Sequence, residues 1–244
     1  MRSWLLGMVV FTAGCSAMPP LSGGGAGGGT AGNAGGAAGG GSASAARVLG
    51  PEQAGVATYY AADGTGSCSF SASPADLDVA AMNSPQWDNS AVCGGCVRVD
   101  GPKGAVVVRI VDQCPDCPSG TLDLSAQAFA KIAEPVDGRV NVRWQPVSCA
   151  VQGAVVLRFK EGSSRFWTGL QVRNTRIPVR ALEVQKNGAW VNVPRESYNY
   201  FVDATGFGTG PFTVRITGND GQQLVETGVM LRDSGDVMGT QQFQ

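Results

Sequence analysis

The stretch VRIVDQCPDCPSGTLDLS, residues 108–125, decides how this chain is interpreted. Its apolar residues alternate up to Ile110, which predicts a strand that delivers Asp112 to its end. A tight loop with two cysteines follows, and a second short strand carries Asp123 between two leucines. Because strands at both ends hold such a loop rigidly, the two carboxylates are well placed to bind a polar ligand. The alternative is that both aspartates only accept hydrogen bonds from turn amides.

Composition narrows the chemistry of this candidate site. The 244-residue chain has a net charge of −1, which gives no reason to expect nucleic acid or a strongly anionic partner. The sequence contains no histidine, which excludes Ser-His-Asp and Cys-His catalysis and any metal site that uses histidine. We expect no cofactor and no metal ion, and a monomer.

Residues 1–15 have the features of an export signal. Arg2 supplies the positive start, and the apolar run that follows is too short to span a bilayer. The segment ends in Thr-Ala-Gly-Cys, which resembles a bacterial lipoprotein cleavage box and predicts lipidation of Cys15. Ordinary signal cleavage nearby is the alternative. Residues 16–46 are rich in Gly, Ala and Ser and predict a flexible linker, so the protein is expected outside the cell, lipid-anchored at the surface or secreted.

Six cysteines remain once Cys15 is set aside, an even number that can pair completely. Export from the cell favours disulfides. The alternative is a zinc site built from the two Cys-x-x-Cys pairs at 93–96 and 114–117, which would leave two free thiols. Six cysteines allow 15 connectivities, and the spacing alone does not choose among them.

The globular part of the sequence predicts two all-β units. Residues 47–150 contain short segments of alternating hydrophobicity separated by turns, which predict a compact β-barrel, with one helix expected at Ser125–Ile132. Residues 151–230 contain strand after strand, with hairpin turns such as Lys186–Gly188, and predict an antiparallel β-sandwich. Residues 231–244 carry no recognisable signal and are separated as a C-terminal tail.

Several motifs in both units resemble those of the expansin family. They are GVATYY (55–60), CGGCVRV (93–99), VDQCPDC (111–117), LDLSAQAF (122–129), VNVRWQPVSC (140–149), KEGSSRFWTGLQVRN (160–174), YNYFV (198–202) and GTGPFTVRIT (208–217). The resemblance covers residues 55–225. It implies a six-stranded double-psi β-barrel followed by an immunoglobulin-like β-sandwich, the family-63 carbohydrate-binding module.

The resemblance assigns roles to single residues of the barrel. Thr58, Asp112 and Asp123 fall on the polysaccharide groove, and Asp123 matches the general acid of the related family-45 endoglucanases. A groove tyrosine of the bacterial family is replaced by Cys114 here. The implied disulfides are Cys68–Cys93, Cys96–Cys149 and Cys114–Cys117.

The resemblance also implies a cellulose-binding face on the sandwich. Its residues are Lys160, Phe166, Trp167 and Tyr198, with Phe166 where the family has a tryptophan. Flat aromatic rings suit this task because they cover the apolar faces of glucose rings at little entropic cost. Without the resemblance, such aromatics are expected to fill the core. Trp144 and Trp190 lie within alternating runs and are expected in the core.

Together these features predict an expansin-like protein that loosens plant-type wall polysaccharide without hydrolysis, by binding cellulose and disrupting glucan–glucan contacts. Glycoside hydrolysis needs a second carboxylate opposite the acid, and the sequence places no counterpart of the endoglucanase base. One alternative is a glycoside hydrolase or lytic transglycosylase that acts on β-glucan or peptidoglycan. The other is a pair of carbohydrate-binding modules with structural groove acids.

Overall fold

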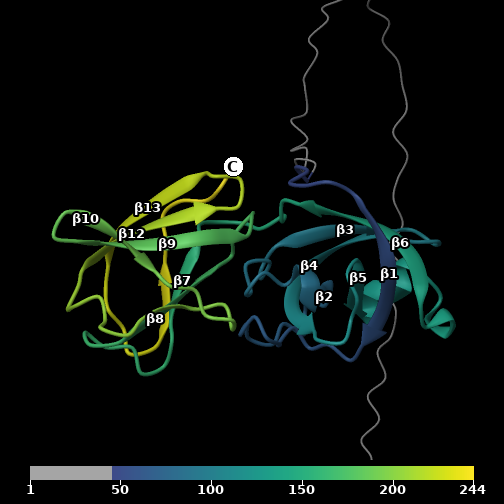
Figure 1. The fold of residues 1–244 in the computed structure, drawn as a ribbon, viewed down its shortest axis with the longest axis horizontal. Helices are drawn as coiled ribbons and strands as arrows, with labels where there is room; N and C mark the ends of the chain where they lie inside the picture. The colour runs from purple at the N-terminus through teal and green to yellow at the C-terminus, as the bar shows by residue number, and fades with distance from the viewer. Residues whose placement is uncertain (1–45) are drawn as a thin grey trace, which may run out of the picture. The chain divides into compact units, whose positions relative to one another are not determined.

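The structure is a computed structural model that describes residues 46–244 (Figure 1). The predicted signal, the lipidation site Cys15 and the linker through residue 45 lie outside the described residues. Figure 1 shows the barrel strands in purple to teal and the sandwich strands in green to yellow. None of the helices in residues 46–244 has the length and apolar character that a membrane span requires.

The first unit is a closed barrel with the strand order β1-β5-β2-β4-β3-β6. Its strands are β1 (Gln53–Tyr60), β2 (Val79–Asn83), β3 (Cys96–Asp100), β4 (Ala105–Cys114), β5 (Thr121–Ser125) and β6 (Val140–Val147). The pairs β1–β5 and β2–β4 are parallel, and the other four pairs are antiparallel. The prediction of a six-stranded barrel is confirmed. Strand β2 is not among the predicted strands, because all five of its residues are buried and show no alternation.

The predicted helix is present as α1 (Ala126–Ile132) and packs against the barrel. The Ser125 hydroxyl caps its start by accepting a hydrogen bond from the Ala128 amide at 3.0 Å. Ala128, Phe129 and Ile132 are buried on one side of the helix. Two 3₁₀ turns, η1 (Ser84–Gln86) and η2 (Pro135–Asp137), complete the helical structure of the described residues. Trp144 joins the barrel core, as expected.

The second unit is a sandwich of two four-stranded sheets, β10-β9-β12-β13 and β11-β8-β7-β14. The strands are β7 (Val156–Phe159), β8 (Thr168–Arg173), β9 (Val179–Lys186), β10 (Ala189–Val193), β11 (Phe201–Asp203), β12 (Phe212–Gly218), β13 (Gln223–Val229) and β14 (Gly235–Met238). All pairs are antiparallel, as predicted. Asn187 and Gly188 both have positive φ, which a two-residue hairpin between β9 and β10 requires.

Trp190 does not lie in the sandwich core, contrary to expectation. It is half-buried on β10, at the edge of its sheet, and the guanidinium of Arg215 lies 4.5 Å from its ring centroid. An edge strand exposes more of both faces, so alternation there does not guarantee burial of a large side chain.

Residues 231–244 belong to the sandwich and do not form a separate tail. Strand β14 pairs with β7, and Phe243 is fully buried in the core. The buried carboxylate of Glu226 accepts hydrogen bonds from the Thr240 amide and hydroxyl and from the Gln241 amide. The C-terminal segment therefore completes both a sheet and a core.

The three disulfides are the same pairs that the resemblance implies. Cys68–Cys93, Cys96–Cys149 and Cys114–Cys117 have Cα–Cα distances of 5.6, 5.3 and 5.4 Å. Because all six sulfurs are bonded, they are not available as thiolates, and the zinc alternative is wrong. Each native disulfide in a small exported domain typically adds ~2–4 kcal/mol of stability.

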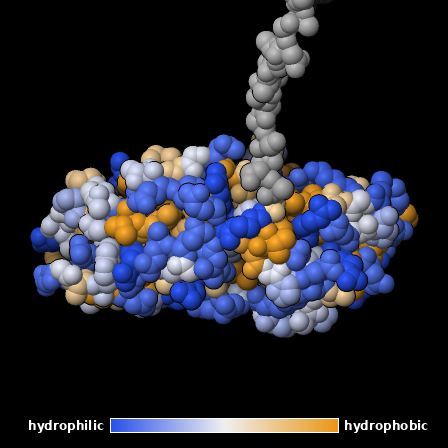
Figure 2. Space-filling model, turned by 90° about the horizontal axis from the view of Figure 1, so that it is seen from above, coloured by the Kyte–Doolittle hydropathy of each residue, from blue (hydrophilic) through white to orange (hydrophobic). Residues whose placement is uncertain are grey.

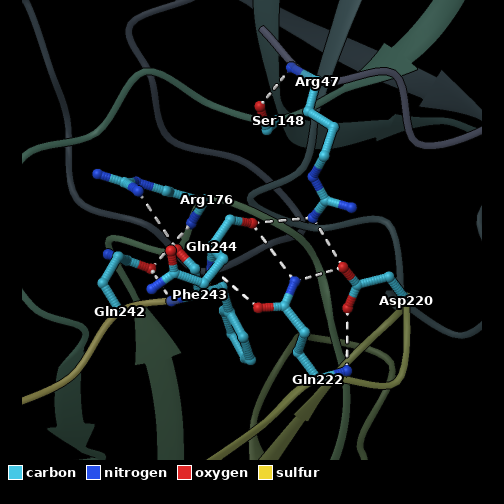
Figure 3. A network of polar contacts seen from close by, with 8 residues as sticks. All are labelled: Arg47, Ser148, Arg176, Asp220, Gln222, Gln242, Phe243 and Gln244. Carbon is cyan, nitrogen blue, oxygen red and sulfur yellow. Dashed lines mark hydrogen bonds and ion pairs between the residues drawn. The ribbon is translucent and has the colours of Figure 1, made fainter. Parts of the chain in front are cut away.

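The beginning of the barrel is tied to the end of the sandwich (Figure 3). The Arg47 Nη2 atom donates to Asp220 Oδ2 at 2.7 Å and to the carbonyl of Gln244 at 2.9 Å. Gln222 joins the same network through both of these residues. Seen from above in Figure 2, hydrophilic residues cover most of the surface and hydrophobic residues form separate groups.

Candidate functional site

Four neighbouring strands of the barrel bring the predicted groove residues into one row. Thr58 on β1 is in register with Asp123 on β5, and Asp123 is in register with Ala81 on β2. Ala81 is in turn in register with Asp112 on β4. Residues in register on adjacent strands share a face of the sheet, so both carboxylates stand on one face with a small residue between them.

Thr58 and Asp123 form the centre of this row. The Thr58 hydroxyl donates a hydrogen bond to Asp123 Oδ1 at 2.6 Å. Burial raises the pKa of Asp123 above its ordinary value; the Thr58 hydrogen bond opposes that shift, and the negative charge of Asp112 adds to it. The protonated form of Asp123 therefore persists to higher pH than that of an exposed aspartate.

Asp112 is held by a loop of the barrel. Its Oδ1 atom accepts hydrogen bonds from the amides of Ser67 at 2.7 Å and of Gln113 at 2.8 Å. Gly66 approaches the carboxylate so closely that a side chain at this position would collide with it. The alternative that the groove acids bond turn amides thus applies to Asp112. Asp123 is bonded to the Thr58 side chain instead.

Tyr60 is a site residue that the sequence analysis does not identify. Its hydroxyl is buried and has no hydrogen-bond partner among the described residues. Burial raises the pKa of Tyr60, and the negative charges of Asp112 and Asp123 raise it further. The phenol is therefore a neutral donor close to both acids. The signal is strand alternation, since Tyr60 follows Thr58 by two positions and shares its face.

The row and Tyr60 together offer two carboxylates and two hydroxyl groups on the barrel strands. These groups can exchange hydrogen bonds with the hydroxyls of a sugar chain without any bond being broken. Strand β4 ends at Cys114, which is bonded to Cys117 and thereby fixes the loop after Asp112. A disulfide thus stands where the bacterial family has a groove tyrosine.

On the sandwich, the other predicted residues lie in loops that adjoin the sheet β11-β8-β7-β14. Lys160 follows β7, Phe166 and Trp167 precede β8, and Tyr198 precedes β11. Atoms of Lys160 and of the Trp167 ring lie about 3.0 Å from the position that a Cβ on Gly169 would take. Gly169 therefore lets the indole ring and the lysine stem rest directly on the strand. Phe166 is 67% exposed, and the Arg165 guanidinium lies 4.4 Å from its ring centroid.

Two tyrosines complete this face. The Lys160 Nζ atom lies 5.8 Å from the ring centroid of Tyr198 and 5.5 Å from that of Tyr200. The two tyrosine rings are 5.9 Å apart. Lys160 therefore links Tyr198 to the Trp167 side of the face, and Tyr200, which is buried, supports the lysine from below. Sequence alternation does not indicate the role of Tyr200, because it precedes the short strand β11.

Comparisons with known proteins agree with this architecture. A family model described as lytic transglycolase matches residues 52–144. Expansin-YoaJ of Bacillus subtilis (strain 168) is 39% identical over 166 residues, which are 66% of this chain and 71% of that protein. Apo expansin of Clavibacter michiganensis superposes with a TM-score of 0.73 at 32% identity, over 80% of this chain and 98% of that one. A mutant of the Clavibacter expansin, solved in complex with cellohexaose, superposes over the same shares with a TM-score of 0.74 at 33% identity.

Proposed function

This chain belongs to the expansin family, and we propose that it loosens plant-type wall polysaccharide without hydrolysing it. The proposed action is to bind cellulose and disrupt the contacts between glucan chains. The observation that carries the proposal is the row of Thr58, Asp123 and Asp112, which presents hydrogen-bonding groups across four barrel strands. The related expansin solved with cellohexaose supports a β-glucan ligand.

In this proposal the barrel competes with neighbouring glucan chains for hydrogen bonds. When it is protonated, Asp123 donates from its carboxyl group, and the raised pKa, which is due mainly to burial, extends that state to higher pH. Tyr60 donates from its unpartnered hydroxyl. Asp112 accepts through Oδ2, because the amides of Ser67 and Gln113 bond to Oδ1. Each exchange is close to isoenergetic, so a glucan chain is released from its neighbours without chemical work.

The aromatic face of the sandwich anchors the protein in this proposal. Trp167 and Tyr198 cover the apolar faces of successive glucose rings, and the exposed ring of Phe166 adds contact area. Lys160 places a cation next to the tyrosines, where it can donate to sugar hydroxyls. The anchor holds the barrel groove close to the cellulose surface and so raises the local concentration of groove and glucan.

A second candidate function is cleavage of β-glucan or peptidoglycan, and the match to the lytic transglycolase model favours it. Hydrolysis requires an acid and, opposite it, a base or a nucleophile. The pKa of Asp123 is raised, as a general acid requires, but Asp112 already accepts hydrogen bonds from the amides of Ser67 and Gln113. We therefore rank the non-hydrolytic function first. In a third possibility the groove acids are purely structural and the chain only binds carbohydrate.

We also propose that the protein is exported as a monomer and acts outside the cell. In this proposal Cys15 carries a lipid and residues 16–46 let the globular part reach the polysaccharide, or the chain is secreted without the anchor. Metabolic labelling of the full-length protein with a radioactive fatty acid tests the anchor. We expect label in the wild type and none in Cys15→Ser; equal labelling of the two would contradict the lipid.

The proposed function is tested on wet cellulose strips held under a constant mechanical load. Residues 46–244 are added to the bath, and strip extension and soluble sugar are measured together. We expect faster extension and no sugar above the buffer control. Asp123→Asn should reduce the extension while cellulose binding persists. Asp137→Asn, an exposed aspartate outside the groove, is the matched control and should extend the strips as the wild type does.

The other functions give different results in the same assay. Released oligosaccharide would overturn the non-hydrolytic proposal and favour cleavage. Unchanged extension by Asp112→Asn and Asp123→Asn would show that the groove acids are structural. If the wild type binds to the strips but does not extend them, the function is carbohydrate binding alone.

A further inference from the structure

A separate hollow lies where the loop after Cys68 meets strand β8 of the sandwich. It has a volume of about 200 Å³. Its polar and aromatic lining comes from Phe70, Ser73, Arg109, Arg173, Asn174 and Thr175. None of these residues belongs to the Thr58–Asp112 row or to the aromatic set around Trp167. Pockets that enclose drug-sized ligands measure ~300–1,000 Å³, so this hollow suits one residue of a longer chain.

Two arginines converge on one aromatic ring in this hollow. The Cζ atoms of Arg109 and Arg173 lie 5.6 Å and 5.7 Å from the Phe70 ring centroid. Neither arginine takes part in any of the ion pairs found within residues 46–244. The hollow is therefore a local concentration of positive charge, although the net charge of the whole chain is only −1.

The Arg109 guanidinium is incompletely satisfied. Its Nε atom is buried and has no hydrogen-bond partner among the described residues. Its Nη2 atom has only a long contact, 3.4 Å, to the Ser73 hydroxyl. A buried donor on a charged group without an acceptor costs free energy, which a ligand oxygen would recover.

Arg173 is held in place by neutral groups. Its Nη2 atom donates to the Ser69 carbonyl at 2.9 Å, its Nη1 atom lies 3.4 Å from the Ser71 hydroxyl, and its Nε atom donates to Gln171. Burial lowers the pKa of Arg173, the charge of Arg158 lowers it further, and Tyr200 and Asp236 act in the opposite direction. The loop contacts fix the guanidinium in position before any ligand arrives.

We propose that this hollow binds the carboxylate of a uronic acid residue in an acidic polysaccharide. Guanidinium groups bind carboxylates through paired, charge-assisted hydrogen bonds, and here two of them are oriented by one ring. The hydroxyls of Ser73 and Thr175 supply partners for the ring hydroxyls of the sugar.

The hollow has a neighbour on the side of Lys160 and Tyr200. Arg173 and Ser71 line a neighbouring hollow of about 290 Å³ together with Lys160 and Tyr200. Arg173 therefore borders both hollows, whereas Arg109 lines only the first. The inference goes beyond the proposed function, because cellulose carries no carboxylate and its binding does not need these arginines.

The test is calorimetric titration of residues 46–244 with trigalacturonate, its methyl ester and cellotriose. We expect trigalacturonate to bind more tightly than the two neutral sugars. Its affinity should fall as the salt concentration is raised, because salt screens the attraction between the charges. Arg109→Gln should weaken trigalacturonate binding by about tenfold, as loss of one charge-assisted hydrogen bond predicts. Arg180→Gln removes an exposed arginine on the other sheet and should leave binding unchanged.

A second variant is needed in case Arg109→Gln does not fold properly. Arg173→Lys keeps the charge but not the forked geometry, and should also weaken trigalacturonate binding. If Arg109→Gln has a lowered melting temperature, its weaker binding could come from misfolding, and the affinity of Arg173→Lys for trigalacturonate is then the deciding measurement. The proposal would be overturned if trigalacturonate bound the wild type no more tightly than its methyl ester does. It would also be overturned if the folded variants bound trigalacturonate as tightly as the wild type. Cellulose pull-down of the same variants should match the wild type, so failure of the proposed function is recognised separately.

Discussion

Thr58 and Asp123 show how one hydrogen bond between two side chains adjusts the chemistry of the groove. Burial favours the neutral carboxyl group of Asp123, and the Thr58 hydroxyl favours its charged form. The sequence places both residues in strands but does not reveal that they meet. Parallel pairing of β1 with β5 brings them together from 65 positions apart.

Thr58→Val is expected to raise the pKa of Asp123 further. Valine matches threonine in shape but donates no hydrogen bond, so the charged carboxylate loses its stabilising partner while its burial is unchanged. Titration of the Asp123 carboxyl carbon by NMR measures the shift. Thr65→Val removes a hydroxyl that bonds to Asp63 outside the row and is the control. A pKa of Asp123 that stays put or falls in Thr58→Val would contradict this account.

The raised pKa of Asp123 also has a consequence for the pH dependence of extension. Since the proposed donor is the protonated acid, extension should be fully active at low pH and decline as the pH rises through the pKa of Asp123. The contribution of Asp123 to the free energy of unfolding should change with pH in the same direction. It is fully present below the pKa of Asp123 in the unfolded chain and is lost as the pH rises through its higher pKa in the folded protein. In Asp123→Asn this decline should disappear, and a wild-type profile that rises with pH would exclude the protonated donor.

At the scale of elements, regular hydrophobic alternation predicts strands correctly, but a segment without alternation can still be a strand. The helix α1 and the strands β1, β4, β6 and β9 follow their hydrophobic patterns. The strands missed by the sequence are β2, which is buried on both sides, and the short strands β11 and β14. A short strand contains too few residues to establish a period, and only its neighbours in the sheet stabilise it.

The C-terminal segment after β14 depends on Glu226. This buried carboxylate on β13 accepts hydrogen bonds from three donors, the Thr240 amide and hydroxyl and the Gln241 amide. We expect Glu226→Gln to lower the free energy of unfolding by about 1–3 kcal/mol, because a charge-assisted acceptor is replaced by a neutral group that also carries unpaired donors. Urea unfolding measures the loss, and Glu161→Gln, at an exposed position, should show none. Equal unfolding midpoints for the two variants would exclude this role.

At the scale of the whole molecule, the Cys68 carbonyl is one of several groups that join the barrel to the sandwich. The carbonyl of Cys68 accepts hydrogen bonds from Gln171 Nε2 at 2.8 Å and from Asn199 Nδ2 at 3.2 Å. Ser90 adds a second connection, because its hydroxyl donates to the Glu196 carbonyl at 2.9 Å and accepts from the Asn199 amide at 3.2 Å. Since these groups are buried or part-buried, breaking them exposes unpaired polar atoms.

We therefore expect the two units to unfold together. Scanning calorimetry of residues 46–244 should show one transition, and the double variant Gln171→Ala/Asn199→Ala should broaden it or split it into two. Gln145→Ala, which removes a side-chain hydrogen bond within the barrel, is the control and should keep one transition. Two transitions already in the wild type would mean that these contacts do not couple the units.

The sequence by itself determined the all-β class and the strands with regular alternation, because local periodicity carries that information. The groove acids and the aromatic face were predicted from the motifs shared with the expansin family and stay predictions. Alternation places Tyr60 on the face of Thr58, but only the tertiary structure brings it near both acids. The tertiary structure also decided that residues 231–244 complete the sandwich and that Arg109 and Arg173 meet at Phe70. These features depend on contacts between residues far apart in the chain. Such contacts are set by strand pairing and burial, which no local pattern in the sequence expresses.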